Sequence, residues 1–477
     1  MSLIPLVTRI LLSLIFFLPM ATGEARSEGF SSGDAVEGYL NLLWGDPQPG
    51  TQQDSQLQFT VTDERGATVT FELSRELIEA HDNFLDWNAQ RVRVHLADQP
   101  RAGLWRAQAL TFLGDGSVTQ RGGPTGSQPW VSILCKYSDI EAEPRNLAYF
   151  QGMYANEIGG LDDYWRKQSY NRIDIAGSTA VDWVELPEPQ TFYIPEPGSG
   201  SNSDRNAIFE DCTEAADPFV DFSNGGTGGF SGINMMLNGL LDCCAWGGGR
   251  FATLDGVTKS WRTTWNPPWA FARSSVIAHE MGHGFGLPHS NNFDGDSNPY
   301  DSPYDVMSSA SGNSINDSVY GAQGKHHTAY HKERLDWFAE SEIIEVTAEG
   351  SATITIDAMA VPVTSNYRMA RIPVPGTDDW YTVETRKRIG YDGNLPGDAV
   401  IISYVDTNRS EPAWTVDTDS PPANYADTEG SMFRVGEVFV DPSRTITVKV
   451  DAETDDGFIV TINGAEAMLL FQDRFED

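Results

Sequence analysis

Residues 279–289 read HEMGHGFGLPH, an H-E-x-x-H-x-x-G-x-x-H arrangement. On a helix, His279 and His283 lie one turn apart and project from the same face. Gly286 can end that helix in a left-handed conformation, which turns the chain back and carries His289 toward the other two imidazoles. Three neutral imidazoles leave a fourth position open for water, as in catalytic zinc sites. We therefore predict that these three histidines bind Zn²⁺.

The residues around this motif provide the other parts of such a site. Ser274 and Ser275 are suitable N-caps for the helix. Glu280 lies about 100° around the helix from its histidine neighbour, where a carboxylate can act as general base on water. Met307, in the later stretch PYDVMSS, is expected to pack its sulfur beneath the imidazoles without binding the metal.

The zinc motif and the methionine that follows it resemble those of the metzincin metallopeptidases. Three further stretches resemble gametolysin-like and immune-inhibitor-A-like secreted peptidases: NLAYFQGMYANEIGGLDDYWRKQSYNRIDIAGS, HTAYHKERLDWF and WYTVETRKRIGYDGNLPGDAVIISYVD. The resemblance covers residues 129–460 and implies a zinc peptidase domain followed by a β-rich domain. Some metzincins carry a tyrosine ligand two residues after the methionine, whereas this chain has Ser309.

The N-terminus has the features of an export signal. Arg9 precedes the apolar run 10–20, which is too short to span a bilayer, and the small residues Ala21 and Gly23 follow it. We expect removal of a signal peptide, 1–23, and a secreted protein with no membrane segment afterwards. A buried N-terminal helix is the alternative.

The cysteine count fits an exported chain. Cys135, Cys212, Cys243 and Cys244 are the only cysteines, and an even number outside the cytoplasm suggests two disulfides. Because adjacent cysteines rarely bridge each other, Cys243 and Cys244 are each expected to pair with one of the other two. A cysteine that binds the zinc and keeps the enzyme latent is disfavoured, because Cys135 lies in the apolar run WVSILCKY.

Length and charge limit the class of protein. The chain has 477 residues, and at about 150 residues per domain this suggests about three domains. The formal net charge of −36 repels phosphate backbones and anionic lipids, which argues against nucleic-acid or membrane partners. The expected partner is a protein or peptide substrate, and the expected state is a monomer.

The strand and turn pattern predicts an α+β protein in which the catalytic domain is flanked by two β domains. Five short strand candidates with a helical insert predict a small β-barrel, which could be a prosegment. Alternating apolar and polar residues near the C-terminus predict an antiparallel β-sandwich. The predicted boundaries are 37–113 for the barrel, 129–345 for the catalytic domain, 346–464 for the sandwich and 465–477 for a tail.

Asp294, Asp296 and Asn298 alternate in NNFDGDSNPYD, and such oxygen-rich spacing can hold Ca²⁺. A solvated turn is favoured over a calcium site, because the glycine and terminal glutamate of an EF-hand loop are absent at the required offsets.

His326, His327 and His331 could form a second zinc site. Histidines that face solvent or support their neighbours are favoured instead, because no further ligand set is evident. The segment 256–265 is predicted to be the edge strand that pairs with substrate.

These features together favour a secreted zinc endopeptidase. A non-catalytic surface-binding or adhesion protein on the same scaffold, and a cell-wall amidase, are the alternatives. Glu280 favours an enzyme, because a protein that only binds has no need of a general base.

Overall fold

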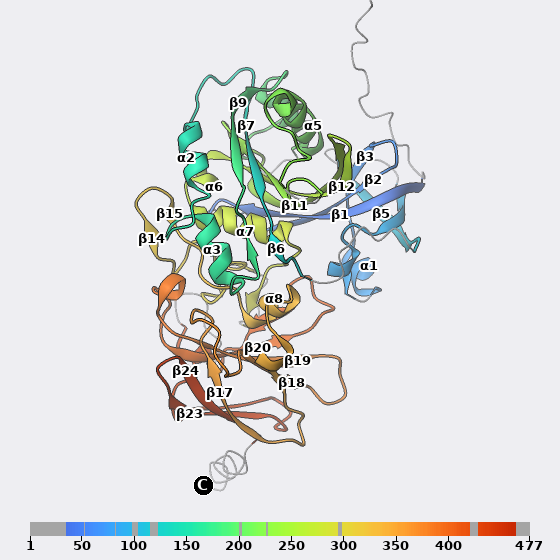
Figure 1. Ribbon diagram of the computed structural model, residues 1–477. Coiled ribbons are helices and arrows are strands. Elements are labelled where there is room, and N and C mark those ends of the chain that lie inside the picture. Colours follow the sequence, from blue (N-terminus) through green and yellow to red (C-terminus); the bar gives the residue numbers. More distant parts are fainter. Residues whose placement is uncertain are drawn as a thin grey trace, which may run out of the picture.

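The computed structural model describes residues 35–51, 53–81, 83–97, 104–114, 123–199, 203–225, 228–293, 298–419 and 428–463. Within these ranges the protein is α+β, with more residues in strands than in helices, as predicted (Figure 1). The predicted signal peptide and C-terminal tail lie outside the described residues.

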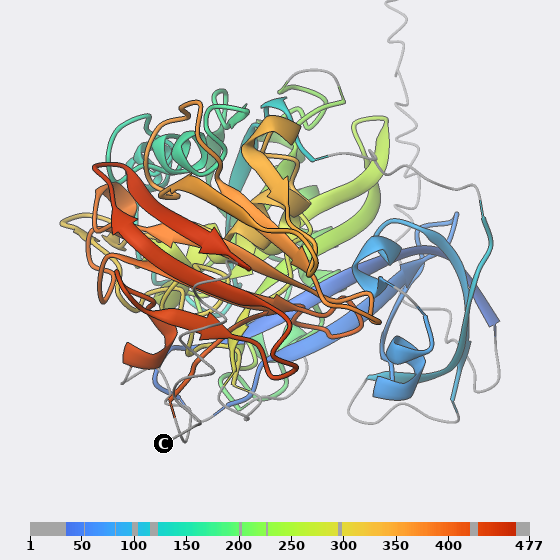
Figure 2. The same ribbon diagram turned by 90° about the horizontal axis from the view of Figure 1, so that it is seen from below.

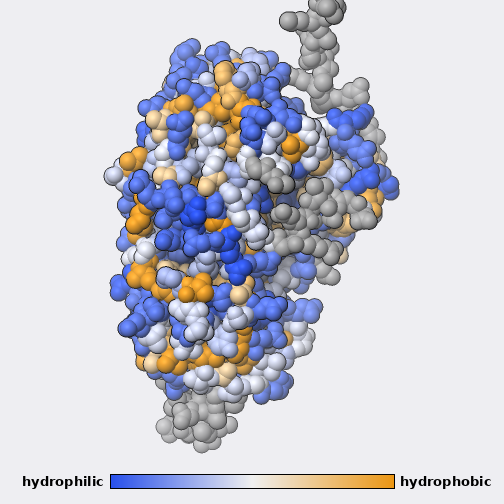
Figure 3. Space-filling view, in the orientation of Figure 1, coloured by the Kyte–Doolittle hydropathy of each residue, from blue (hydrophilic) through white to orange (hydrophobic). Residues whose placement is uncertain are grey.

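None of the helices in the ranges above is both long and apolar enough to cross a bilayer. On the face drawn in Figure 3, hydrophilic side chains predominate and apolar ones gather in small patches.

The N-terminal region is a closed barrel of five strands, as predicted. Hydrogen-bonded pairs β1–β2, β2–β3, β3–β5, β5–β4 and β4–β1 complete the ring. Its apolar core includes Leu40, Phe59, Phe71 and Val94, which are all buried. The strands are β1 (Ala35–Pro47), β2 (Gln56–Thr62), β3 (Thr68–Glu72), β4 (Arg91–Leu96) and β5 (Trp105–Phe112), with α1 (Arg75–Glu79) and a 3₁₀ turn (Phe84–Trp87) between β3 and β4.

Strand β1 is longer than the barrel requires and continues into the next sheet. Its first residues pair with β4, whereas Leu43 to Pro47 pair antiparallel with Gly248 to Cys244 of β11. Figure 2 shows the blue strands β1 and β2 reaching from the barrel into the body of the molecule. The barrel and the central sheet are therefore hydrogen-bonded into one ten-stranded sheet.

The central sheet has the order β9-β7-β10-β12-β11. Four strands run parallel and β11 runs antiparallel to β12. The prediction that 256–265 is an edge strand is wrong, because this segment forms β12, which lies between β10 and β11. The outer strands of this set are β9 and β11, and β1 pairs with β11 on its outer side. The strands are β7 (Trp130–Lys136), β9 (Thr179–Glu185), β10 (Gly232–Leu237), β11 (Cys244–Leu254) and β12 (Val257–Asn266).

Helices cover both faces of the central sheet. On one face α5 (Arg205–Ala216) packs Ile208 and Phe209 against strand residues that include Ile133. On the other face α2 (Leu147–Gly152), α3 (Leu161–Gln168) and α7 (Ser274–Gly284) share a second apolar cluster with Trp130. Shorter elements complete the region: β6 (Gly126–Ser127), β8 (Ile173–Asp174), α4 (Gln190–Tyr193), α6 (Pro268–Phe271), β14 (Asn316–Asp317), β15 (Gly321–Ala322) and α8 (Ala329–Arg334).

The C-terminal region contains two sheets that share one apolar cluster, the arrangement expected of a sandwich. The six-stranded sheet also takes in Asn291–Asn292, so it reaches the loop that follows His289. Its order is β13 (Asn291–Asn292), β21 (Ala413–Thr415), β20 (Ala399–Val405), β19 (Trp380–Arg386), β18 (Met369–Pro373) and β16 (Ile343–Glu345). The four-stranded sheet is β17 (Ala352–Asp357), β24 (Gly457–Ile462), β23 (Thr447–Glu453) and β22 (Val438–Val440).

All four cysteines form disulfides, but the predicted pairing is wrong. Cys135 of β7 bonds to Cys212 of α5, and Cys243 bonds to its neighbour Cys244. Because α5 packs directly on β7, the Cα atoms of Cys135 and Cys212 lie 5.9 Å apart. The adjacent pair is held at the start of β11, where the Asp242 carboxylate accepts hydrogen bonds from both of its backbone N–H groups.

Candidate metal centre

The helix that carries the motif is buried along its whole length. α7 runs from Ser274 to Gly284, and its N-cap is Arg273, not a serine as predicted. The serine hydroxyls serve tertiary contacts instead: Ser274 donates to the carbonyl of Ala322, and the Ser275 and Ser311 hydroxyls share a hydrogen bond. The helix end is as predicted, because Gly286 has φ +93°.

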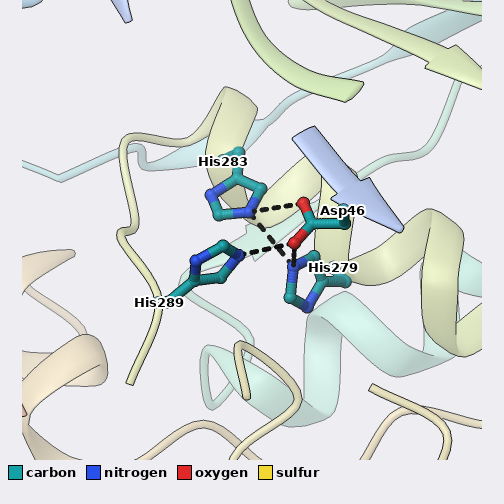
Figure 4. Close-up of side chains that lie close together, drawn as sticks. All are labelled: Asp46, His279, His283 and His289. Carbon is teal, nitrogen blue, oxygen red and sulfur yellow. Dashed lines mark hydrogen bonds and ion pairs between the residues drawn. The ribbon is translucent and has the colours of Figure 1, made fainter. Parts of the chain in front are cut away.

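The three motif histidines converge on one point (Figure 4). His279 and His283 come from α7, and His289 comes from the loop that follows it. The Nε2 atoms of His279 and His283 are 3.1 Å apart. All three side chains are fully buried, and each offers a ring nitrogen within 4.8 Å of the others. The structure thus brings together the residues that the sequence predicted as ligands.

The hydrogen bonds of two rings show which nitrogens face the centre. Nδ1–H of His279 donates to the carbonyl of Val306 at 2.7 Å, and Nδ1–H of His283 donates to the carbonyl of Leu287 at 2.8 Å. A neutral imidazole has one donor and one acceptor nitrogen, so both Nε2 atoms present lone pairs. Burial lowers the pKa of His283 to about 3, which keeps that ring neutral.

A fourth group, Asp46, faces the same point from β1. Its carboxylate lies 3.3 Å from Nε2 of His279, 3.2 Å from Nε2 of His283 and 2.7 Å from Nε2 of His289. Tyr300 donates a hydrogen bond to the same carboxylate at 2.7 Å.

These acceptors fit a metal ion. The Nε2 lone pairs carry partial negative charge and the carboxylate carries a full one. Buried within a few ångströms of one another, these groups repel unless a cation lies between them. Imidazole and carboxylate ligands are typical of zinc and other divalent transition metals. The buried group of Asp46, His279, His283 and His289 can therefore hold a metal ion.

Asp46 is not among the residues predicted from the sequence. It is 243 positions from His289, and its local sequence, Trp44-Gly45-Asp46-Pro47, has the composition of an ordinary turn. The only signal in that segment is a strand candidate that ends just before an aspartate, which many surface strands share.

Glu280 is the one acidic residue of α7 and is completely buried. Neither of its carboxylate oxygens has a hydrogen-bond partner among the described residues. Burial and the nearby charge of Asp46 raise the pKa of Glu280 well above its ordinary value. A buried carboxylate without a donor is costly, and such groups are commonly associated with a function.

Close approach between α7 and β11 places the helix beside β1. A Cβ atom on Gly247 would clash with the carbonyl oxygen of Glu280 and lie 2.9 Å from Cβ of His283. Glycine is therefore required where the strand passes under the metal-binding turn of the helix.

Met307 packs against α7 at Gly282. It is buried, and a Cβ atom on Gly282 would lie 2.5 Å from its sulfur. The turn that carries it is fixed by Asp305, whose carboxylate accepts a hydrogen bond from the Met307 backbone N–H at 2.8 Å. Because His279 donates to Val306 in the same turn, this turn also orients the ring of one candidate ligand.

The second histidine group is buried and hydrogen-bonded. His331 of α8 donates to Asp305 at 2.7 Å, and His327 lies 3.4 Å from the same carboxylate. Asp305 also accepts from the backbone and hydroxyl of Thr328, so its lone pairs are already occupied. His326 accepts a hydrogen bond from Lys332 at 3.1 Å. This arrangement favours a supporting role over a second metal site.

The predicted calcium group is only partly described. Asp294 and Asp296 lie outside the described residues, whereas Asn298 accepts a hydrogen bond from the backbone of Tyr300 at 3.2 Å.

Comparison with known proteins adds no family. No protein-family model matches the chain, and no curated protein shows significant similarity to it. The assignment of a function therefore depends on the chemistry of the site itself.

Proposed function

We propose that this chain is a secreted zinc endopeptidase of the metzincin type, which hydrolyses peptide bonds in extracellular proteins. The observation that carries this proposal is a buried carboxylate without a partner, Glu280, on the same helix as two imidazoles whose lone pairs converge with a third. A protein that used the metal only for structure would gain nothing from burying that carboxylate.

The roles of the residues follow from their positions. His279, His283 and His289 would hold the ion, which when bound would lower the pKa of water and polarise a peptide carbonyl. Glu280 would accept the proton of the attacking water on a carboxylate oxygen and then deliver it to the nitrogen of the leaving amine. Burial and the nearby charge of Asp46 raise the pKa of Glu280, which favours uptake of the proton from water.

The substrate would bind as an extended strand. Strand β11 contacts α7, and on its outer side its backbone already pairs with one extended segment, β1. A peptide in that position would bring a carbonyl to the ring of imidazoles, and its backbone would supply the hydrogen bonds.

Export is supported by the cysteine chemistry. Two disulfides are formed by the four cysteines, and such bonds persist in oxidising compartments. The N-terminal sequence with Arg9 and its apolar run is consistent with the same destination.

The test is a peptidase assay on zinc-loaded protein with Glu280→Ala as the matched variant. Both proteins are assayed on casein and on a set of fluorescence-quenched peptides. Each is tested before and after limited digestion with trypsin, which is inhibited before the assay. We expect wild-type cleavage that a chelator removes and that zinc restores. Removal of a general base is expected to cost about 10²–10⁴-fold in rate.

Two outcomes would overturn the proposal. One is a digested wild-type protein that contains one zinc per chain and cleaves no peptide. The other is a Glu280→Ala variant that cleaves as fast as the wild type. Metal content and circular dichroism of both proteins show whether a loss of rate reflects lost chemistry or a lost fold.

A further inference from the structure

The N-terminal barrel contributes a strand that lies where a substrate would lie. Residues Leu43 to Pro47 pair antiparallel with β11, in the register Asp46 opposite Ala245 and Trp44 opposite Gly247. The backbone groups on the outer side of β11 in this stretch are therefore already paired. An extended peptide could not reach them while β1 remains in place.

The side chain at the centre of this strand also occupies the metal site. The Asp46 carboxylate is within 2.7–3.3 Å of all three Nε2 atoms. In Figure 4 its two oxygens point into the space that the three rings enclose. A carboxylate there would take the coordination position that water needs.

Neighbouring side chains hold Asp46 in this position. Trp44 stacks on His283 with ring centroids 5.3 Å apart, and it meets His289 edge-on at 5.0 Å. Tyr300, from the loop between the third histidine and Met307, donates to the Asp46 carboxylate. Asp46 is thus packed and hydrogen-bonded as part of the site, and is not an incidental contact of the strand.

The barrel itself has the properties of a unit that can leave. Its apolar core contains residues of the N-terminal region alone. Its contacts to the central region include hydrogen bonds from Arg205 to Gln58, from Arg250 to Thr62 at 2.9 Å and from Asn206 to Thr70 at 3.1 Å. Polar interfaces of this kind are typical of domains that separate. Strand β1 also makes apolar contacts, because Leu43 packs in the core of the central sheet and Tyr39 stacks on Phe251 with ring centroids 4.0 Å apart.

We propose that the barrel is an intramolecular inhibitor, in which β1 occupies the substrate edge of β11 and Asp46 is the fourth ligand of the metal. The protein is latent in this form and gains an open coordination position when β1 is withdrawn. This proposal rests on the proposed function for its biological meaning. Its central claim, that Asp46 closes the metal site, can be tested without any substrate.

The first test measures access to the metal. The full chain carrying Glu280→Ala, which prevents self-cleavage, is loaded with Co²⁺ and titrated with acetohydroxamate while its visible spectrum is recorded. We expect acetohydroxamate to leave the spectrum of the Glu280→Ala protein unchanged. The double variant, Glu280→Ala with Asp46→Ala, should bind the hydroxamate saturably. Asp46→Asn, which keeps the size of the side chain, is expected to bind the ligand as well, because the amide is a weaker ligand.

Asp54→Ala is the matched control, since it removes an exposed carboxylate between β1 and β2. It should behave like the background protein. Equal hydroxamate binding with and without Asp46 would overturn the proposal, as would a cobalt spectrum that the Asp46 variants leave unchanged.

The second test uses the processed protein. We expect the full chain with Asp46→Ala to hydrolyse peptides at least about tenfold faster than the full-length wild type. N-terminal sequencing of the active wild-type form should show that it begins beyond Pro47. An active form that retains β1 and an unaltered cobalt spectrum would contradict latency. If the metal becomes accessible in the Asp46 variants but no form cleaves peptides, the claim that Asp46 closes the metal site is upheld and the proposed peptidase function is refuted.

Discussion

Asp305→Ala should weaken the turn beneath the metal site more than any exposed substitution. The Asp305 carboxylate is fully buried and accepts hydrogen bonds from the backbone of Met307 at 2.8 Å and of Thr328 at 3.2 Å. It also accepts from His331 at 2.7 Å. Alanine leaves both backbone N–H groups without an acceptor, and each buried orphan costs about 1–3 kcal/mol.

The expected loss of stability is about 4 kcal/mol. Removal of one partner of a buried charged pair typically costs about 3–5 kcal/mol, which agrees with the two orphaned N–H groups. A domain has only about 5–15 kcal/mol to lose, so the effect is large. Zinc affinity should also fall by about 10–100-fold, because the carbonyl of Val306, which orients His279, lies in the same turn.

The assay has two parts. Urea unfolding of the zinc-free protein, followed by the fluorescence of its tryptophans, gives the change in stability, and competition with a chromophoric chelator gives the zinc dissociation constant. Asp378→Ala is the control, because this aspartate is exposed and should change stability by less than about 0.5 kcal/mol. A loss below about 1 kcal/mol together with unchanged zinc affinity would refute the reasoning.

Two further predictions concern packing and pH. Gly247→Ala would place a Cβ atom against the carbonyl of Glu280 and 2.9 Å from His283 Cβ, so we expect a loss of stability of about 1–3 kcal/mol and weaker zinc binding. Gly350→Ala is the control, because its Cβ atom meets only ordinary contacts. Equal melting temperatures and zinc affinities for the two variants would contradict this prediction. Burial raises the pKa of Asp305, but the charge of His331 and the bonds from both histidines hold it well below the ordinary value. The stability that Asp305 contributes is therefore present above the unfolded pKa of about 3.9 and is lost as the pH falls below it. Unfolding midpoints measured from pH 6 to pH 3 should fall more steeply for the wild type than for Asp305→Asn, and parallel curves would be the contrary result.

The parts of the protein that depend on local spacing could be predicted from sequence. His279 and His283 share a helix face because a helix repeats every few residues, and Gly286 ends that helix because glycine tolerates positive φ. The barrel strands follow from their alternation of apolar and polar residues, which requires only that one face be buried.

The parts that depend on which strands become neighbours could not be predicted. The disulfide partners were wrong because the packing of α5 on β7 decides which cysteines meet. The segment 256–265 was predicted to be an edge strand, but it forms β12, which lies between β10 and β11 in the sheet. Neither outcome is set by the local sequence, because both depend on which elements pack or pair with one another.

The sequence by itself determined a helix with two imidazoles on one face, a third on the return loop, and a carboxylate beside them. Only the tertiary structure decided that Asp46, 243 positions before His289, faces the same point. The physical reason is that strand pairing is a long-range interaction. β1 reaches the metal site because its backbone finds partners on β11, and backbone hydrogen bonds are the same for every sequence.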